Sequence, residues 1–497
     1  MEGEFKGRTL RQHIGVYLGP LVALALLLIG PPASLGEIEA VSSPQNAWVV
    51  LSLLSLMVVW WTTEAVPIPV TSLLPLIVLP AAGITIMDEA GAPYMDSVVV
   101  LLLGGFIVAK AIERWNLHAR IALNIVVRAG DHPHRLLAGF MAAGAVLSMW
   151  ISNSATAIMM MPIALSVASE MLGEDRADAP LTWALLLGVA WSCSIGGLGT
   201  PVGTPTNLIV MGYLNENAGF EIGFLSWMML GVPVVLLMVP AAWFVLTRWA
   251  FRLEAHTGMA GQEVVREHLS ALGPMTTPEK RTLGLFAVIA TLWVLRRPLS
   301  EFTIGGVTPL AGMGDAGIAI LGVVLAFLIP AGGGRKGEAL LDWRTAETIP
   351  WGVLLLFGGG LSLAAVITAT GLGAWIGTAM SGLSVLPILL VMAILTAFVI
   401  FVTEVTSNVA TASALMPVIG AAAIATGLDV ELLAAPLAMA ASCAFMLPLA
   451  TGPNAVAYAT GRLTIPTMAA AGFRLNLLGI VLITIAVYLI APIAFGG

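Results

Sequence analysis

Long apolar runs alternate with short polar connections along almost the whole chain. An apolar run of about 20 residues is long enough to cross the hydrocarbon core of a bilayer as one helix. The pattern predicts eleven membrane-spanning helices, at residues 14–33, 46–61, 66–84, 97–113, 181–213, 226–248, 282–297, 314–330, 351–373, 433–460 and 475–494.

Two further apolar segments, 136–171 and 384–426, are about twice the length of one span, and polar residues interrupt each of them in its middle. A helical hairpin that enters and leaves the membrane on the same side explains both the length and the interruption. Non-helical backbone at membrane depth is tolerated only where it is buried in protein or lines a cavity. We therefore expect two re-entrant hairpins with their tips at a cavity.

The composition agrees with a polytopic membrane protein. Hydrophobic residues make up 59% of the 497 residues, charged residues make up 10%, and the mean hydropathy is +0.98. A soluble domain carries about 25% charged residues. The lipid bilayer is therefore the expected partner, and nucleic acid is not. With two cysteines and six histidines, the latter all outside the central apolar runs, the chain offers little for a disulfide scaffold, a zinc site or a histidine-based catalytic centre.

The distribution of Lys and Arg predicts how the chain crosses the membrane, because basic loops stay in the cytoplasm. The basic N-terminus and the linker 248–281 are placed inside. The first hairpin, between Arg135 and Arg176, opens to the cytoplasm, whereas the second lies in a stretch without basic residues and opens outward. We expect a multi-pass protein of the cell inner (plasma) membrane, with a cytoplasmic N-terminus and an extracytoplasmic C-terminus. Arg296 and Arg297 do not fit, since they end a span that should exit outward.

The two hairpins also carry the same sequence. Nine positions match or are similar without a gap, each pair 255 residues apart, so the chain consists of two related halves. Because the hairpins open to opposite sides, the repeat is inverted, which is a common plan in secondary transporters with a site near the midplane. The matched positions are Ser148, Ser152, Asn153, Ala155, Thr156, Ala157, Met161, Pro162 and Ile163 with Thr403, Ser407, Asn408, Ala410, Thr411, Ala412, Met416, Pro417 and Val418.

Four polar breaks, at 152–154, 199–207, 407–409 and 450–454, supply the candidate chemistry. The N-terminus of a half-helix directs free N–H groups and the positive end of the helix dipole at an anion. Unwound carbonyls and hydroxyls are hard oxygen ligands of the kind that Na⁺ prefers. The breaks contain no Lys or Arg. An anion would therefore be held by dipoles, amides, hydroxyls and nearby Na⁺.

Several segments resemble one known family, the divalent anion/sodium symporters, which carry citrate, dicarboxylates and sulfate. They are WWTTEAVPIPVTSLLPLIVLP (60–80), SNSATAIMMMPIA (152–164), SIGGLGTPVGTPTN (194–207), TEVTSNVATASALMPV (403–418) and CAFMLPLATGPNA (443–455).

The resemblance implies an all-α polytopic membrane protein with about eleven spans, two re-entrant hairpins in an inverted repeat, and an elevator-type transport mechanism. It also implies a homodimer formed through a scaffold domain. The expected division of the chain is scaffold spans 1–4 at 1–131, hairpin 1 with spans 5–6 of a transport domain at 132–251, a cytoplasmic linker at 252–281, scaffold spans 7–9 at 282–380, and hairpin 2 with spans 10–11 at 381–497.

The resemblance further implies two or more Na⁺ sites with the substrate between them. Two positions depart from the family pattern: Val409 stands where a hydroxyl is usual, and Gly452 stands where Pro is common. The residues expected at the first Na⁺ are Ser148, Ser152, Asn153 and Gly199, and at the second Thr403, Thr406, Asn408 and Ala450. Those expected at the substrate are Ser152, Asn153, Ser154, Thr200, Ser407, Asn408, Val409, Thr451 and Gly452.

Together these features predict a secondary transporter, not an enzyme, that imports a small divalent anion with two or more Na⁺. A C4-dicarboxylate such as succinate is the favoured substrate. The alternatives are a sulfate or tricarboxylate symporter, a Na⁺-independent dicarboxylate exchanger, and a channel. An intramembrane hydrolase using Ser152 or Ser407 would need a base near the serine, and only Glu404 is close in sequence.

Overall fold

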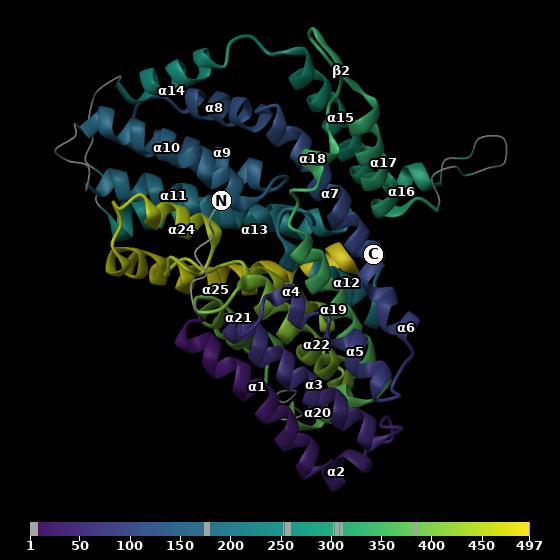
Figure 1. The fold of residues 1–497 in the computed structure, drawn as a ribbon. Helices are drawn as coiled ribbons and strands as arrows, with labels where there is room; N and C mark the ends of the chain where they lie inside the picture. The colour runs from purple at the N-terminus through teal and green to yellow at the C-terminus, as the bar shows by residue number, and fades with distance from the viewer. Residues whose placement is uncertain are drawn as a thin grey trace.

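The structure is a computed structural model that describes residues 8–172, 179–251, 253, 260–301, 303, 308, 312–380, 382 and 386–496. Helices form nearly all of it, and the only strands in these ranges are the short antiparallel pair β1 (Pro330–Gly332) and β2 (Arg335–Ala339) (Figure 1). Arg176 and most of 252–259, which entered the charge argument and the linker prediction, lie outside the described residues.

The first half of the chain contains α1 (Leu10–Ile29), α2 (Ala33–Gly36), α3 (Pro44–Thr63), α4 (Ile68–Thr71), α5 (Leu74–Ala81), α6 (Met87–Gly91), η1 (Ala92–Met95), α7 (Ser97–Arg114), α8 (Leu117–Ala129), α9 (Pro133–Ser148), α10 (Asn153–Leu172), α11 (Pro180–Gly196), η3 (Gly197–Gly199), α12 (Pro205–Asn217), α13 (Phe224–Phe244) and η4 (Val245–Ala250).

The second half contains α14 (Ala260–Ala271), α15 (Thr277–Val294), α16 (Arg296–Ser300), α17 (Gly314–Leu328), α18 (Trp343–Ala346), α19 (Trp351–Ala369), α20 (Leu372–Met380), α21 (Ile388–Thr403), α22 (Asn408–Thr426), α23 (Val430–Ala441), α24 (Gly452–Ala459) and α25 (Ile465–Phe495).

Within the described residues, nine helices are long and apolar enough to cross a membrane. They coincide with seven of the predicted spans and with α10 and α22, the second arm of each predicted hairpin. The remaining predicted spans coincide with shorter or broken helices. The first two turns of α15 contain Glu279, Lys280 and Arg281, so its apolar part is shorter than the helix.

Two predicted boundaries are wrong. α25 begins at Ile465, ten residues before the predicted span, because the helix accommodates Arg474, whose half-buried side chain donates to the carbonyl of Ala470 at 2.6 Å. The break predicted at 450–454 is longer, since α23 already ends at Ala441 and α24 begins only at Gly452.

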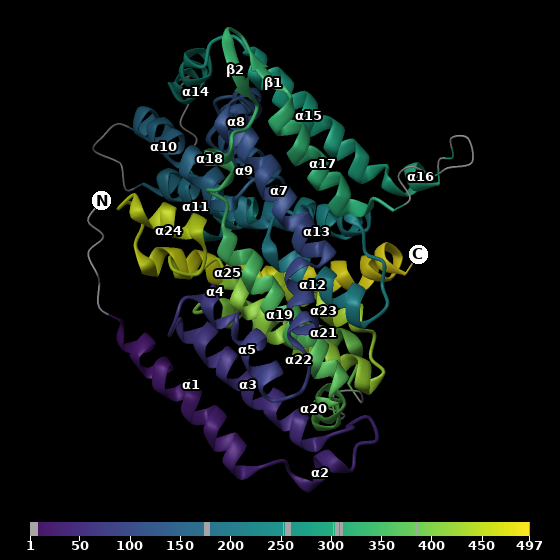
Figure 2. The ribbon, with the colours of Figure 1, turned by 45° about the vertical axis from the view of Figure 1, so that its right-hand side comes forward.

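Small residues set the packing of α1, which lies along α3 at the edge of the molecule in both views (Figures 1 and 2). A Cβ on Gly15 would stand 2.0 Å from the hydroxyl of Thr63, and one on Gly19 would stand 2.7 Å from the ring of Trp60. Without a hydrophobic drive between helices in lipid, such close backbone approach supplies the packing energy.

Helices distant in sequence pack together around the two hairpins. α9 and α10 pack with α11, and α24 of the second half packs against α10 and α11. α25 crosses α13, α21 and α23, whereas α7 packs with α15 and α17 on the other side (Figure 1). The helices of the two halves are therefore interleaved, and the division into scaffold and transport domains stays a prediction.

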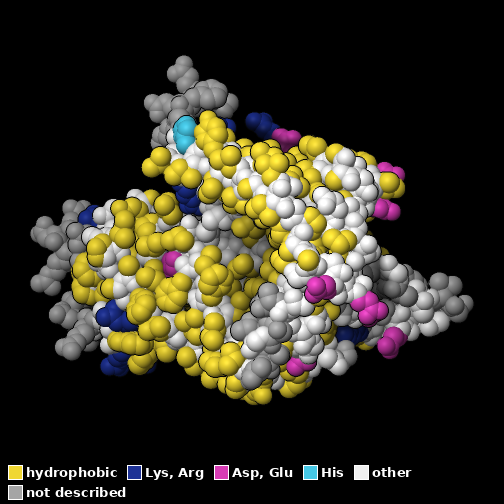
Figure 3. Space-filling model, turned by 90° about the horizontal axis from the view of Figure 1, so that it is seen from below, with side chains coloured by type: hydrophobic (Ala, Val, Ile, Leu, Met, Phe, Trp, Pro, Cys, Tyr) yellow, Lys and Arg dark blue, Asp and Glu magenta, His cyan; other side chains and the backbone are white. Residues whose placement is uncertain are grey.

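The outer surface is mainly apolar. In the view from below, hydrophobic side chains cover most of the face, with Lys and Arg mainly toward one edge and Asp and Glu mainly toward the opposite edge (Figure 3). A membrane protein has this kind of surface when its apolar belt faces lipid and its charged residues lie at the two water interfaces.

Candidate functional site

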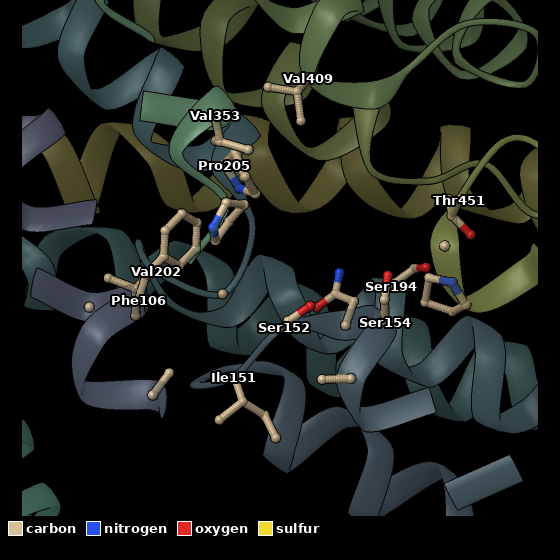
Figure 4. Close-up of a pocket in the computed structure, with 18 of the residues that line it drawn as sticks. Phe106, Ile151, Ser152, Ser154, Ser194, Val202, Pro205, Val353, Val409 and Thr451 are labelled. Atoms are coloured by element: carbon tan, nitrogen blue, oxygen red, sulfur yellow. The ribbon is translucent and has the colours of Figure 1, made fainter. Parts of the chain in front are cut away.

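One cavity of about 450 Å³ brings the polar breaks of both halves together. Ser152, Ser154 and Thr451 lie toward one end of it, and Phe106 and Val353 lie toward the other (Figure 4). Its volume is typical of small-molecule sites. The breaks contribute Ile151, Ser152, Asn153, Ser154, Val202, Gly203, Pro205, Ser407, Asn408, Val409, Ala450, Thr451, Gly452 and Pro453.

Four helix N-termini meet at this cavity. α10 starts at Asn153 and α22 at Asn408, directly after Ser152 and Ser407 at the tips of the hairpins. α12 starts at Pro205 and α24 at Gly452. Each N-terminus leaves backbone N–H groups without helical partners and carries a partial positive charge. The cavity is therefore electropositive without a basic side chain at its polar end.

Two asparagines hold the unwound segments in the same way. The amide nitrogen of Asn207 donates to the carbonyls ten and seven residues earlier, of Gly197 at 2.9 Å and Thr200 at 2.8 Å. The amide of Asn454 repeats this pattern, donating to Ala444 at 3.0 Å and Leu447 at 3.1 Å. The two breaks are thus structural counterparts. Their alignment pairs Gly203 with Ala450 and Thr204 with Thr451.

A cluster of oxygens beside the first hairpin fits a Na⁺ ion. Ser148 Oγ and Asn153 Oδ1 are buried and have no nitrogen or oxygen partner among the described residues. A Cβ on Gly197 would stand 3.0 Å from the amide of Asn153, and one on Gly203 would stand 2.5 Å from the carbonyl oxygen of Gly197 and 3.0 Å from that of Ser148. Buried oxygens without partners cost free energy unless a cation or donor satisfies them.

Gly199 and Thr200, which the sequence places at the ion and the substrate, point elsewhere in this structure. The carbonyl oxygen of Gly199 lies against Gly231 of α13. The hydroxyl of Thr200 is fully buried and donates to the carbonyl of Met149. Neither residue lines the cavity, whereas Gly203 does. The alignment of GTPTN (203–207) with ATGPN (450–454) is the sequence signal that identifies Gly203.

The second hairpin holds its oxygens differently. Thr403 is fully buried, and its hydroxyl lies 2.8 Å from Asn408 Oδ1 and 2.9 Å from the carbonyl of Ala441. The hydroxyl of Thr406 donates to the carbonyl of Val402 and lies 2.6 Å from that of Thr411. Ala450 and Asn408 line the cavity. A cation at the second hairpin would have to replace the hydrogen bond between Thr403 and Asn408 Oδ1. At the first hairpin, Asn153 Oδ1 has no such partner among the described residues.

Glu404, directly after α21, anchors the unwound segment between α23 and α24. Its carboxylate is 4% exposed and accepts from the backbone N–H groups of Phe445 at 2.8 Å, Met446 at 2.9 Å and Leu447 at 3.1 Å. The amide of Asn476 in α25 donates to it at 2.8 Å. The repeat places Met149 at the equivalent position of the first hairpin, so this anchor exists in one half only.

Ser154 and Gly452, which are both expected at the substrate, are in contact. A Cβ on Gly452 would stand 2.0 Å from Ser154 Oγ and 3.1 Å from Ser154 Cβ. The serine hydroxyl therefore occupies the space that the missing side chain leaves. Val409 lines the same cavity and supplies no hydrogen-bond donor from its side chain.

Charged residues on the cavity wall were not predicted as part of the site. Lys110 and Glu113 of α7 line the cavity and form an ion pair at 2.7 Å. Ser194 of α11 lines it too, with an unpartnered hydroxyl among the described residues. No sequence signal identified α7, since it reaches the breaks only through tertiary packing.

Comparison with known proteins gives consistent matches. The profile of the family described as "Sodium:sulfate symporter transmembrane region" matches residues 21–493. The chain is 40% identical to the sodium-dependent dicarboxylate transporter SdcS of Staphylococcus saprophyticus, over 99% of this chain and 94% of that protein. It is 38% identical to SdcS of Staphylococcus aureus strain USA300, over 98% of this chain and 92% of that protein.

Two solved structures share the fold at low sequence identity. The YdaH transporter of Alcanivorax borkumensis aligns with a TM-score of 0.59 and 15% identity, covering 89% of this chain and 97% of that one. MtrF of Neisseria gonorrhoeae aligns with a TM-score of 0.58 and 14% identity, covering 92% and 97%. The predicted all-helical, polytopic membrane fold is confirmed.

Proposed function

The chain belongs to the sodium:sulfate symporter family, and from that premise we propose that it imports a C4-dicarboxylate such as succinate together with two or more Na⁺ ions. The dicarboxylate is favoured over sulfate or a tricarboxylate because the similar SdcS proteins are sodium-dependent dicarboxylate transporters. The family is one of transporters, so the hydroxyls of Ser152 and Ser407 are binding groups and not nucleophiles.

The observation that carries the proposal is the meeting of four helix N-termini at one cavity beside buried, unpartnered oxygens. The N-termini of α10 and α12 lie in one half of the repeat and those of α22 and α24 in the other. A dianion with a carboxylate at each end would place one carboxylate against each half. Neutral donors hold it firmly only while Na⁺ ions add their charge, which couples the two fluxes.

The two cation sites would use Ser148, Asn153 and the carbonyls at Gly197 and Gly203 in the first half, and Thr403, Asn408 and Ala450 in the second. The first cluster has free oxygens, whereas Asn408 Oδ1 is already bonded to Thr403. We therefore expect the first Na⁺ to bind beside hairpin 1 and the second to bind only after the Thr403–Asn408 bond opens.

The proposed setting is the inner membrane, with the N-terminus and the β1–β2 loop in the cytoplasm and the C-terminus outside. The separation of basic and acidic side chains toward opposite edges supports this orientation (Figure 3). The proposed assembly is a homodimer formed through the scaffold helices, and the proposed motion is an elevator-like sliding of the hairpin-bearing helices past them. The cavity wall supports this motion, because α7 and α19 form one side and the hairpins form the other.

Uptake into proteoliposomes tests the proposal. Labelled succinate should accumulate only with an inward Na⁺ gradient, with excess succinate competing better than citrate or sulfate. An inside-negative potential should stimulate uptake, because each net positive charge moved gains about 2.3 kcal/mol per 100 mV. Asn153→Ala and Asn408→Ala should each raise the Na⁺ concentration needed for half-maximal uptake about tenfold or more, since each removes a cation ligand. Na⁺-independent exchange would contradict coupling, and stronger competition by sulfate would reassign the substrate.

A further inference from the structure

The cavity that contains the proposed substrate site is also lined by a charged pair on α7. Lys110 and Glu113 are the only charged side chains among the described residues that line it. Their side chains are 24% and 20% exposed, and Lys110 Nζ lies 2.7 Å from Glu113 Oε2. Neither residue lies at a helix N-terminus or in a polar break. The hydrogen bonds that anchor the breaks therefore do not explain why this pair lines the cavity.

One face of α7 forms part of the cavity wall. Gly105, Phe106, Ala109, Lys110 and Glu113 all line it, at a spacing that places them on one side of a helix. Eight residues of helix rise by about 12 Å. This face of α7 is therefore longer than a four-carbon dianion, and a substrate in the cavity has Lys110 on the wall around it.

The other charges near the end of α7 are committed to different partners. Arg114 binds Asp342 at 2.7 Å and Glu338 at 3.7 Å, and its guanidinium lies over the ring of Trp115. These groups hold α7 to the β2 loop and do not line the cavity. Lys110 is thus the one cation of the described lining residues that a passing anion can meet.

We propose that Lys110 is a second anion station, which receives a carboxylate of the substrate on its way to or from the cytoplasmic face. The substrate carboxylate would take the place of Glu113 at the ammonium group. A partly exposed ion pair contributes little net free energy, so the exchange of one carboxylate for another is nearly neutral. Lysine suits this role, because its ammonium group is a compact, hydrated charge that makes no rigid bidentate contact.

Competition by Glu113 keeps this station weak. A lone lysine would retain the dianion after its Na⁺ ions have left, whereas the paired lysine lets it go. The station therefore sets the affinity for dicarboxylate at the cytoplasmic face and leaves the affinity at the outer face unchanged. This inference rests on the proposed function and orientation, and it assigns the route by which substrate leaves.

Vesicles of both orientations separate the two faces. Na⁺-dependent succinate transport would be measured in right-side-out and inverted membrane vesicles containing equal amounts of each variant. Lys110→Gln should raise the half-saturating succinate concentration in inverted vesicles about fivefold, with less change in right-side-out vesicles. Glu113→Gln should lower it in inverted vesicles, because it frees the ammonium group. Lys110→Arg keeps the positive charge, so the half-saturating concentration should stay closer to the wild-type value than in Lys110→Gln.

Lys280→Gln is the matched control, since Lys280 is an exposed lysine on α15 that does not line the cavity. The opposite signs expected for Lys110→Gln and Glu113→Gln cannot both come from a folding defect. Equal affinities at the cytoplasmic face in wild type and all variants, or equal changes at both faces, would overturn the anion station alone. Absence of Na⁺-dependent succinate transport in the wild type would overturn the proposed function instead.

Discussion

At the scale of single residues, Ser154 of the first half and Gly452 of the second half are in contact at the cavity. The sequence places both residues among those expected at the substrate but does not show that they touch. The hydroxyl of Ser154 lies where a Cβ at position 452 would stand. A substitution at either position therefore changes the space available to the side chain at the other.

Gly452→Ala should weaken substrate binding by turning Ser154 away from its place. The new Cβ would stand 2.0 Å from Ser154 Oγ, so the hydroxyl must rotate. Loss of one hydrogen bond of about 0.5–1.5 kcal/mol corresponds to a rise in the KM for succinate of about two- to twelvefold. The KM for succinate, determined from uptake titrations at saturating Na⁺, measures this loss of binding.

The double variant Ser154→Ala/Gly452→Ala removes the clash and should be no worse than Ser154→Ala alone, because contacting residues are not additive. Gly284→Ala is the control, since a Cβ there has open space around it. A double variant whose KM is the product of the two single effects would show that the contact does not matter.

At the scale of elements, Glu404 joins α21, the unwound segment after α23, and α25. The four groups that donate to its carboxylate tie together segments up to 72 residues apart. The sequence identified Glu404 only as an ionisable residue near a hairpin tip. Its hydrogen-bond partners are known only from the tertiary contacts. Every residue except proline has a backbone N–H group, so the sequence does not show which of these groups bind Glu404.

Glu404→Ala should lower the stability of the folded protein more than Glu404→Gln. Each buried N–H left without an acceptor costs about 1–3 kcal/mol, and glutamine keeps one oxygen for them. Cys193 and Cys443 are buried free thiols. A thiol-reactive dye therefore reports thermal unfolding in detergent. Glu347→Ala, at an exposed glutamate, should leave the transition in place. Equal midpoints for Glu404→Ala and wild type would show that the anchor is not structural.

At the scale of the whole molecule, an aromatic column links the first hairpin to the helices expected to form the scaffold. The ring of Trp150, on the cavity wall, stacks with Phe224 at 5.9 Å, and Phe224 stacks on Trp293 of α15 at 4.4 Å. Asp315 of α17 accepts from the N–H of Phe224 at 2.8 Å and pairs with Arg296 at 3.2 Å. The proposed elevator-like motion would separate these contacts.

Phe224→Ala should therefore shift the population away from the conformation described here. An aromatic stack is worth about 0.5–1.5 kcal/mol beyond its buried area, which corresponds to a shift of up to about tenfold. The rate of labelling of a cysteine introduced by Thr348→Cys, at the cavity lining, measures the open population. Trp293→Ala should act in the same direction. Unchanged labelling rates in both variants would argue against the column as a link between the two groups of helices.

The sequence alone determined the membrane class, the long helices, the two hairpins, the repeat and the family, because hydropathy, charge and repetition are written along the chain. It predicted Ser152, Asn153, Ser407, Asn408 and Thr451 at one cavity, and the structure does bring these five together.

Only the tertiary structure decided that Gly203 packs against Gly197 and Ser148 while Gly199 faces α13, that Glu404 anchors one half alone, and that α7 brings Lys110 to the cavity wall. These facts depend on which backbone groups remain free and which distant helices pack together. The residue pattern of a single segment contains neither.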